Sequence, residues 1–377
     1  MLALSLMNEK YDIIIVGAGI SGSVLAERYA NVLGKKVLVL EKRDHVGGNC
    51  YDYYNADGIM VSKYGAHLFH TNYDDVWQYV NRFSQWYPYE HRVLSFVDGQ
   101  LLPIPVNITT VNRLFGLDIK TEAEMKSWLF QNTLKIEFPQ NSEEVSLSKI
   151  GPALYEKMIK NYTKKQWDLW PHELEASVLE RIPVRNNFDD RYFGDQHQAQ
   201  PVGGFTPIFE KMLNHPKITV LLNTDYFELK EKLAGFKKLF FTGPIDRFFN
   251  NKFDKLQYRS IRFEFETLNV EFYQENSVIN YPNDYDFTRI VEYKHITRQV
   301  HPKTTISKEY SSWEGEPIYP VPTQRNREVY SRYHQEAEGL EREGVYFVGR
   351  LANYKYFNMD QAFKNSLDLF GRINKNA

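Results

Sequence analysis

Short apolar runs and amphipathic stretches alternate at the start of the chain. Residues 11–16 and 36–40 are apolar runs of the length that buried parallel strands have. The stretch between them, residues 23–33, has the pattern of a helix. A strand, a helix and a second strand in this order predict a βαβ unit.

The middle of the chain and its end favour helices. Helical spacing of apolar side chains begins at Asp74 and recurs in residues 121–131 and 152–161, so that residues 108–185 are predicted to be mostly helical. A last helix is predicted from about Met359.

Several other segments have the patterns of strands. Residues 92–105 alternate and predict a hairpin, and residues 257–310 alternate in the manner of antiparallel strands. The short apolar runs at 217–222 and 237–242, and the strand-to-turn segment at 345–350, indicate a return to the first sheet. The first sheet therefore receives strands from distant parts of the chain.

These patterns predict an α/β fold with α+β insertions, built from three parts. The predicted boundaries are a discontinuous Rossmann-like nucleotide-binding domain at 1–75, 195–250 and 335–377, a helical bundle at 76–90 and 106–194, and an antiparallel sheet domain at 91–105 and 251–334.

Composition and charge narrow the classes of function. The 46 basic and 48 acidic residues nearly cancel, which argues against a general nucleic-acid binder. A single cysteine, Cys50, excludes an intrachain disulfide and a multi-thiolate metal cage, and no metal-binding motif is found, so no metal is expected. The 26 Tyr, 25 Phe and 6 Trp are numerous enough to line a pocket for a planar or sugar ligand as well as a core.

A glycine motif lies where the first predicted strand meets the first predicted helix. Gly17, Gly19 and Gly22 have the GxGxxG spacing, which allows a tight turn, close approach of backbone to a pyrophosphate, and close helix packing. Glu41 ends the second strand, where a carboxylate can bind ribose hydroxyls. Together these features predict a dinucleotide site.

A second glycine pair favours FAD over NAD. Gly47, Gly48 and Asn49 follow the second strand at once, as suits a chain that passes tightly along a larger cofactor, although a plain turn would also use such glycines. The late segment at 348–350 fits the strand by which flavoprotein folds return to the isoalloxazine ring.

At this point the chain resembles the UDP-galactopyranose mutase family. The resemblance covers nearly the whole chain and rests on six collinear segments. These are Arg43-Asp44-His45-Val46-Gly47-Gly48-Asn49, Tyr64-Gly65-Ala66-His67-Leu68-Phe69-His70-Thr71, Tyr162-Thr163-Lys164-Lys165-Gln166-Trp167, Arg181-Ile182-Pro183-Val184-Arg185, Thr288-Arg289-Ile290, and Phe347-Val348-Gly349-Arg350-Leu351 with Tyr354, Tyr356, Met359 and Asp360.

The resemblance implies an isomerase that interconverts UDP-galactopyranose and UDP-galactofuranose. It implies that N5 of reduced FAD attacks the anomeric carbon of the sugar and expels the nucleotide, that the ring opens and closes as a furanose, and that no net electrons move. It also implies the same three-part fold, with the antiparallel sheet forming one wall of the cleft.

The resemblance also implies roles for particular residues. As catalytic residues we expect Arg181 and Arg289, which match the arginines that hold the diphosphate, with His67 and Arg350 beside the flavin. A diphosphate leaving group requires fixed cationic donors, and guanidinium offers a bidentate fork. Contacts to FAD are expected from Gly17, Gly19, Gly22, Glu41, Gly47, Gly48, Asn49, His67, Arg350, Met359 and Asp360, and contacts to the substrate from Tyr162, Thr163, Trp167, Arg181, Tyr192, Asn280, Arg289, Tyr319, Tyr356 and His91.

The chain departs from the family pattern mainly around the base and the sugar, so the chemistry is better supported than the substrate. The departures are Asn161 and Asp168 for glycines, Met158 and Ile159 for aromatics, His91 for an asparagine, Asn358 for an aspartate, and Ile318 for a tyrosine. The same chemistry on dTDP-fucopyranose or UDP-N-acetylgalactosamine therefore stays open. An oxidoreductase of the amine-oxidase type would leave Arg181 and Arg289 unexplained. A noncatalytic nucleotide-binding protein would leave the six matching segments unexplained.

Location and partners complete the expectations. No apolar stretch approaches the length of about 18 residues that a membrane helix requires, and residues 1–7 lack the basic region of a signal peptide. We expect a cytoplasmic homodimer that binds a nucleotide sugar and neither nucleic acid nor membrane.

Overall fold

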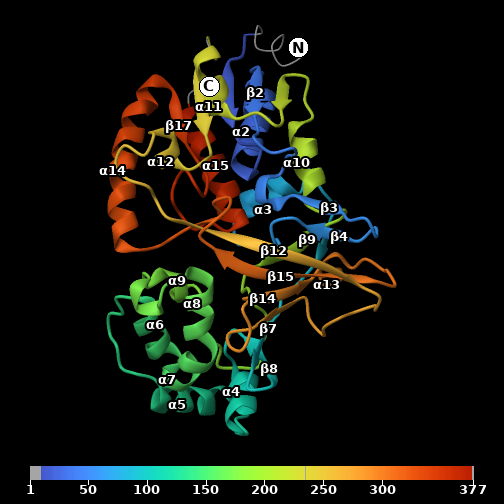
Figure 1. Ribbon diagram of the computed structural model, residues 1–377, viewed down its shortest axis with the longest axis vertical. Helices are drawn as coiled ribbons and strands as arrows, with labels where there is room; N and C mark the ends of the chain where they lie inside the picture. Colours follow the sequence, from blue (N-terminus) through green and yellow to red (C-terminus); the bar gives the residue numbers. More distant parts are fainter. Residues whose placement is uncertain (1–9, 234, 376–377) are drawn as a thin grey trace.

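The computed structural model describes residues 10–233 and 235–375. The expectation about residues 1–7 lies outside this part of the chain. Figure 1 shows a sheet with its helices at one end of the molecule, a group of helices at the other end, and the long strands β12 and β15 between them. No helix within the described ranges is long and apolar enough to cross a bilayer.

The sheet at the first end is parallel and has five strands. In spatial order they are β10 (Ile218–Leu221), β2 (Val37–Leu40), β1 (Ile13–Val16), β11 (Lys238–Phe241) and β17 (Val345–Phe347). The predicted βαβ start and the return of the later segments to this sheet are confirmed. The helix after β1 begins at residue 20, earlier than the sequence pattern indicated, because it starts directly after the glycine turn.

Helices cover both faces of this sheet, which explains its continuous apolar strands. Ile13, Ile15 and Val39 face the side of α2 (Ile20–Asn31), whereas Ile14 and Leu38 face the opposite side. The helices around the sheet are α2, α3 (Asp74–Val80), α10 (Thr206–Leu213), α11 (Tyr226–Leu229), α12 (Ile245–Phe248), α14 (Gln324–Leu340) and α15 (Met359–Ile373), with the short turns η1 (Gly48–Cys50), η4 (Lys230–Lys232) and η5 (Glu341–Glu343).

The second large sheet has seven strands. In spatial order they are β16 (Tyr319–Pro320), β12 (Tyr258–Leu268), β15 (Thr304–Ser312), β14 (Arg289–Glu292), β13 (Val278–Asn280), β7 (Val93–Val97) and β8 (Gln100–Ile104). The predicted hairpin is confirmed as β7 and β8, which turn at Asp98 and Gly99, both with positive φ. The sheet is antiparallel as expected except for β13 and β7, which pair in parallel.

Short strands and a helical group complete the fold. The remaining strands are β3 (Asp52–Tyr54) with β4 (Met60–Ser62), and β5 (Phe69–Thr71) with β9 (His197–Pro201) and β6 (Trp86–Pro88); α13 (Lys294–Thr297) follows β14. The helices are α4 (Ile108–Phe115), α5 (Glu122–Asn132), α6 (Ser142–Lys149), α7 (Gly151–Leu154), the π-helical turn η2 (Tyr155–Lys160), α8 (Asn161–Trp167), η3 (Pro171–Glu173) and α9 (Ser177–Glu180).

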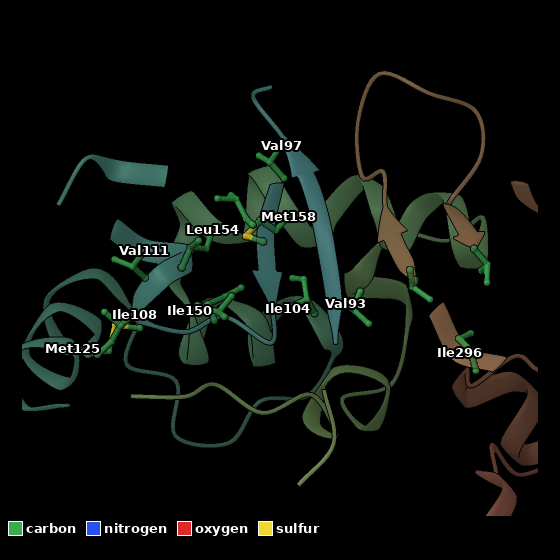
Figure 2. Packing of buried hydrophobic residues seen from close by; sticks show 14 of the residues in the cluster. Val93, Val97, Ile104, Ile108, Val111, Met125, Ile150, Leu154, Met158 and Ile296 are labelled. Atoms are coloured by element: carbon green, nitrogen blue, oxygen red, sulfur yellow. The ribbon is translucent and has the colours of Figure 1, made fainter. Parts of the chain in front are cut away.

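The helical group is fixed to the second sheet by a common core. In Figure 2, Leu154 and Met158 lie beside the hairpin that carries Val93, Val97 and Ile104. The helix predicted at 152–161 is present but continues to Trp167 and widens into the π-helical turn, which the periodicity did not reveal. Apolar packing thus positions one wall of the cavity described below.

Candidate active site at the meeting of two cavities

The first cavity, of about 320 Å³, lies at the carboxyl ends of β1 and β2. Gly19 caps α2 without a side chain, so the first backbone amides of this helix are open to an anion. A Cβ at Gly17 would lie 2.2 Å from Oγ1 of Thr242, and one at Gly22 would lie 1.9 Å from the carbonyl oxygen of Gly17. The three glycines therefore have the positions that the motif requires, with Gly22 in the helix packing rather than in the cavity lining.

The second glycine pair forms the opposite wall of this cavity. Gly48 has φ of +57°, and a Cβ there would lie 2.8 Å from Cα of Gly19, so the two backbones approach closely. Glu41 accepts hydrogen bonds from the amides of Ala18 (2.7 Å) and Arg43 (2.9 Å), and each carboxylate oxygen keeps a second lone pair. These features fit a dinucleotide whose pyrophosphate lies at α2 and whose ribose lies at Glu41.

Arg43 and Glu316, the latter from the connection between β15 and β16, close this cavity. Arg43 donates to Asn49 (3.0 Å) and to Glu316, and its guanidinium lies 4.2 Å from the ring centre of Tyr64. Glu316 also pairs with Lys42 at 2.9 Å. The predicted contact residue Asn49 thus lies in the lining, held in place by Arg43.

The second cavity, of about 250 Å³, meets the first at four residues that line both. These are His67, Arg350, Asn358 and Met359. All ten residues predicted for the substrate line the second cavity, namely Tyr162, Thr163, Trp167, Arg181, Tyr192, Asn280, Arg289, Tyr319, Tyr356 and His91. Of the residues predicted for the cofactor, Asp360 does not lie in the described lining of either cavity, because its side chain turns toward His70 and Thr71.

Three guanidinium groups face the second cavity from three different parts of the fold. Arg181 follows α9, Arg289 begins β14, and Arg350 follows β17. Glu309 is the one carboxylate in the described lining, with Oε2 3.4 Å from Nε of Arg289. With Glu309 counted as ionised, the described lining has an excess of two positive charges; burial raises the pKa of Glu309 although Arg289 opposes the rise, and protonation would make the excess larger. Nε of Arg289 is a buried donor with no hydrogen-bond partner among the described residues.

Tyrosines support these arginines. Nη2 of Arg289 donates to the hydroxyl of Tyr162 at 2.6 Å, and the guanidinium of Arg181 lies 4.3 Å from the ring centre of Tyr356. The rings of Tyr356 and Tyr319 are stacked with their centres 5.2 Å apart. Burial works to raise the pKa of Tyr356, but Arg181 and Arg350 bring this pKa below its ordinary value.

Comparisons with known proteins agree with this geometry. A profile of the family described as UDP-galactopyranose mutase matches residues 157–356, and one described as an NAD(P)-binding Rossmann-like domain matches residues 15–83. A probable UDP-galactopyranose mutase from Klebsiella pneumoniae is 37% identical over 96% of this chain and 94% of its own.

The chain belongs to the UDP-galactopyranose mutase family.

Two other relatives of the chain are informative. A dTDP-fucopyranose mutase from Escherichia coli is 36% identical over 94% of this chain and 96% of its own. The crystal structure of a reduced UDP-galactopyranose mutase superimposes with a TM-score of 0.78 at 17% identity, covering 98% of this chain and 95% of that one. The predicted fold class, the isomerase class and FAD as the cofactor are confirmed.

Two histidines that line the second cavity are held neutral by burial. His67 lies where the cavities meet, and its Nδ1 is 2.9 Å from the carbonyl oxygen of Gly65. The side chain of Gln200 donates a hydrogen bond to the backbone carbonyl of His67 at 3.2 Å. Burial lowers the pKa of His67 to about 4, and burial together with Arg289 lowers the pKa of His91 to about 3. Above pH 5 neither imidazole adds positive charge to the cavity.

The sequence did not indicate two residues of this site. Glu309 carries the carboxylate beside Arg289, and Gln200 holds the segment that carries His67. Glu309 lies in β15 and is only 4% exposed. A charged residue at an inward position of an alternating strand is unusual, and this pattern could have indicated a functional carboxylate. Gln200 offers no comparable signal.

The close approach of Gly19 and Gly48 predicts the effect of a branched side chain. A Cβ at Gly19 would meet Cα of Gly48 at 3.6 Å, an ordinary contact, so Gly19→Val should fold. Its γ-methyl groups would occupy the space of the pyrophosphate, and we expect purified Gly19→Val to lack the flavin absorbance bands. Gly339→Val, at an exposed helical glycine with open space, should keep them. Equal flavin content in both variants would contradict this assignment.

The low pKa of His67 predicts acid sensitivity. The folded pKa of about 4 is below the usual 6.5, so the contribution of His67 to stability is complete above pH 6.5 and is lost as the pH falls toward 4. Between pH 7 and 4.5 the wild type should lose about 2–3 kcal/mol of unfolding free energy more than His67→Gln. Urea unfolding at constant FAD measures this, with His334→Gln at an exposed histidine as the control. Identical losses in the wild type and His67→Gln would refute it.

Proposed function

We propose that this chain interconverts UDP-galactopyranose and UDP-galactofuranose with FAD in its reduced form and without net electron transfer. The observation that carries the proposal is the excess of two positive charges in a cavity that opens onto the cofactor cavity at His67 and Arg350. A nucleotide diphosphate has a matching negative charge, and its sugar must reach the reactive part of the cofactor.

The arginines suit a diphosphate that departs and then returns. Guanidinium groups bind phosphate oxygens through pairs of N–H donors, and such charge-assisted bonds strengthen as the leaving group gains negative charge. Nε of Arg289 is buried with no hydrogen-bond partner among the described residues, and Arg181 is held over the ring of Tyr356 while its Nε donates to the carbonyl of Val178. These two residues would hold the nucleotide near the sugar while their bond is broken, so that the same bond can form again.

Reduced FAD, when bound, supplies a nucleophilic nitrogen for the anomeric carbon of the sugar. The chain's own residues determine where the sugar can lie. Arg350 is fixed by hydrogen bonds to the carbonyl of Phe357, and His67 is fixed by Gly65 and Gln200, so the junction of the cavities has rigid walls.

A second substrate is favoured by one observation at the predicted base site. Met158 and Ile159 line the cavity from the π-helical turn, where the family usually has aromatic side chains. Aliphatic and thioether groups can pack against the methyl group of thymine, and Asn358 gives the sugar side an amide in place of a carboxylate. The alternative function is therefore the same reaction on dTDP-fucopyranose.

The remaining assignments are proposals of the same kind. They are the roles of the individual site residues, the three-domain division at the boundaries given above, a cytoplasmic location, and a homodimer. Fractionation of cells and sedimentation of the purified holoenzyme test the last two.

The arginines give a direct prediction. Arg181→Ala and Arg289→Ala should each reduce kcat/KM by the equivalent of roughly 2–5 kcal/mol, since each removes a charged partner of the diphosphate. Lysine at either position should restore only part of the lost kcat/KM, because the bidentate fork of the guanidinium is absent. Arg262→Ala, which removes an exposed arginine bonded to Glu264, is the control and should be near wild type. Near-wild-type turnover by both cavity variants would place the diphosphate elsewhere.

Turnover by the reduced enzyme tests the reaction and the substrate together. Dithionite-reduced protein should convert UDP-galactofuranose to the pyranose, whereas oxidised protein should be nearly inactive. A tenfold higher kcat/KM for dTDP-fucofuranose, about 1.4 kcal/mol in activation free energy, would make the second substrate the physiological one. Equal activity of the oxidised and reduced forms would refute the proposed use of the flavin.

A further inference from the structure

A third histidine of the cavity is held differently from His67 and His91. His70 lies in β5, is 8% exposed, and lines the second cavity. Its Nδ1 lies 2.9 Å from Oδ2 of Asp195, and its ring is stacked on Phe193 with centres 3.6 Å apart. Of the three histidines in the described lining, it is the one whose ring is hydrogen-bonded to a carboxylate.

The carboxylate of Asp195 is itself fixed. Its Oδ1 accepts a hydrogen bond from Nδ2 of Asn72 at 2.9 Å, and Oδ1 of Asn72 accepts one from the amide of Gln196 at 2.8 Å. Because an ionised carboxylate only accepts, Asp195 keeps a proton on Nδ1 of His70. In this tautomer Nε2 is the hydrogen-bond acceptor of the ring, and the carboxylate behind Nδ1 strengthens it.

Nε2 of His70 has no hydrogen-bond partner among the described residues. Asp360, in the first turn of α15, interacts with His70 electrostatically, and no hydrogen bond joins the two side chains among the described residues. Burial raises the pKa of Asp360, and Oδ1 of Asp360 has no hydrogen-bond partner in the described part of the chain. The acceptor at Nε2 is therefore left for a ligand in the cavity.

We propose that Nε2 of His70 accepts a hydrogen bond from a hydroxyl group of the transferred sugar, and that Asp195 is the positioning residue that fixes its tautomer. This inference rests on the proposed function. A diphosphate offers only acceptors at neutral pH, so the donors that a nucleotide sugar can present to Nε2 are hydroxyl and base N–H groups. β5 packs against α15, and the first residue of that helix, Met359, and its N-cap, Asn358, lie at the junction with the cofactor cavity, which is where the sugar must be.

Binding to the oxidised holoenzyme tests the proposal without turnover. Affinities for UDP-galactose and for UDP alone are measured by calorimetry for the wild type, His70→Phe, His70→Gln and Asp195→Asn. We expect His70→Phe to weaken UDP-galactose binding about tenfold, or about 1.4 kcal/mol, and UDP binding less than twofold. His70→Gln, which restores an acceptor but stacks less well, should recover part of the loss. Asp195→Asn should give an intermediate loss for the sugar nucleotide alone.

A second histidine–aspartate pair provides a matched control. Nε2 of His197 lies 3.1 Å from Oδ1 of Asp74, and its ring is stacked on Trp77, but His197 is outside the described lining of the cavity. His197→Phe and Asp74→Asn should leave both affinities unchanged. If His70→Phe weakens UDP as much as UDP-galactose, or binds UDP-galactose at least as well as His70→Gln, the role of His70 is packing and the proposal is wrong. Unchanged binding by Asp195→Asn would overturn the positioning role.

The deoxy analogues identify the hydroxyl. On the wild type, the UDP-sugar that lacks the bonded hydroxyl should lose the same factor that His70→Phe loses, and on His70→Phe it should lose nothing further. If every deoxy sugar loses equally on both proteins, no hydroxyl is bonded to Nε2 and the proposal fails. Turnover of UDP-galactofuranose by the reduced wild type is measured in parallel, so that failure of the proposed function is recognised separately.

Discussion

Among the described residues, three guanidinium groups and one carboxylate line the second cavity, and much of the fold serves to hold this arrangement. Like charges repel, so such a cluster forms only where the backbone fixes each member. Arg350 comes from the end of the parallel sheet, Arg289 from the antiparallel sheet, and Arg181 from the end of a short helix in the helical group. Each of the three parts of the fold contributes one arginine, and the cavity exists because these parts meet.

The neutral groups around the cluster keep its charge directed at the ligand. The hydroxyl of Tyr162 accepts from Arg289. The ring faces of Tyr319 and Tyr356 lie against Arg350 and Arg181, and these contacts leave the guanidiniums charged. Burial keeps His67 and His91 uncharged, so neither adds to the repulsion. The cavity is therefore preorganised for a dianion before the ligand binds. No reorganisation of these charges is then needed when the leaving group departs and returns.

Local patterns in the sequence predicted the elements whose cause is local. The turn at Gly17 and Gly19, the hairpin at Asp98 and Gly99, and the parallel strands all follow from backbone freedom or continuous apolar runs, and the structure has them. The resemblance to a family then indicated the arginines and tyrosines of the site, all of which line the cavity. The contact of Asp360 with the cofactor depended on a match in sequence alone and stays a prediction; its side chain interacts with His70 and Thr71.

The features that could not be predicted depend on contacts between distant segments. The parallel pairing of β13 with β7 joins residues far apart in the chain, and the pairs of His70 with Asp195 and of Arg289 with Glu309 have no spacing that a sequence pattern could show. The π-helical turn has the apolar positions of an ordinary helix, and only the backbone of the folded chain shows the wider turn. The residue types of the site could be predicted from the sequence, whereas the pairs of strands and side chains required the folded structure.

The central claim is that the excess positive charge of the second cavity is matched by the two phosphates of a nucleotide diphosphate. Its most direct test is the affinity of the oxidised holoenzyme for UDP, UMP and uridine at two salt concentrations. The account predicts that UDP binds about a hundredfold more tightly than UMP, or about 2.7 kcal/mol, and that added salt reduces this difference. Affinities for UDP, UMP and uridine within about threefold of one another, less than one kcal/mol apart, would contradict it.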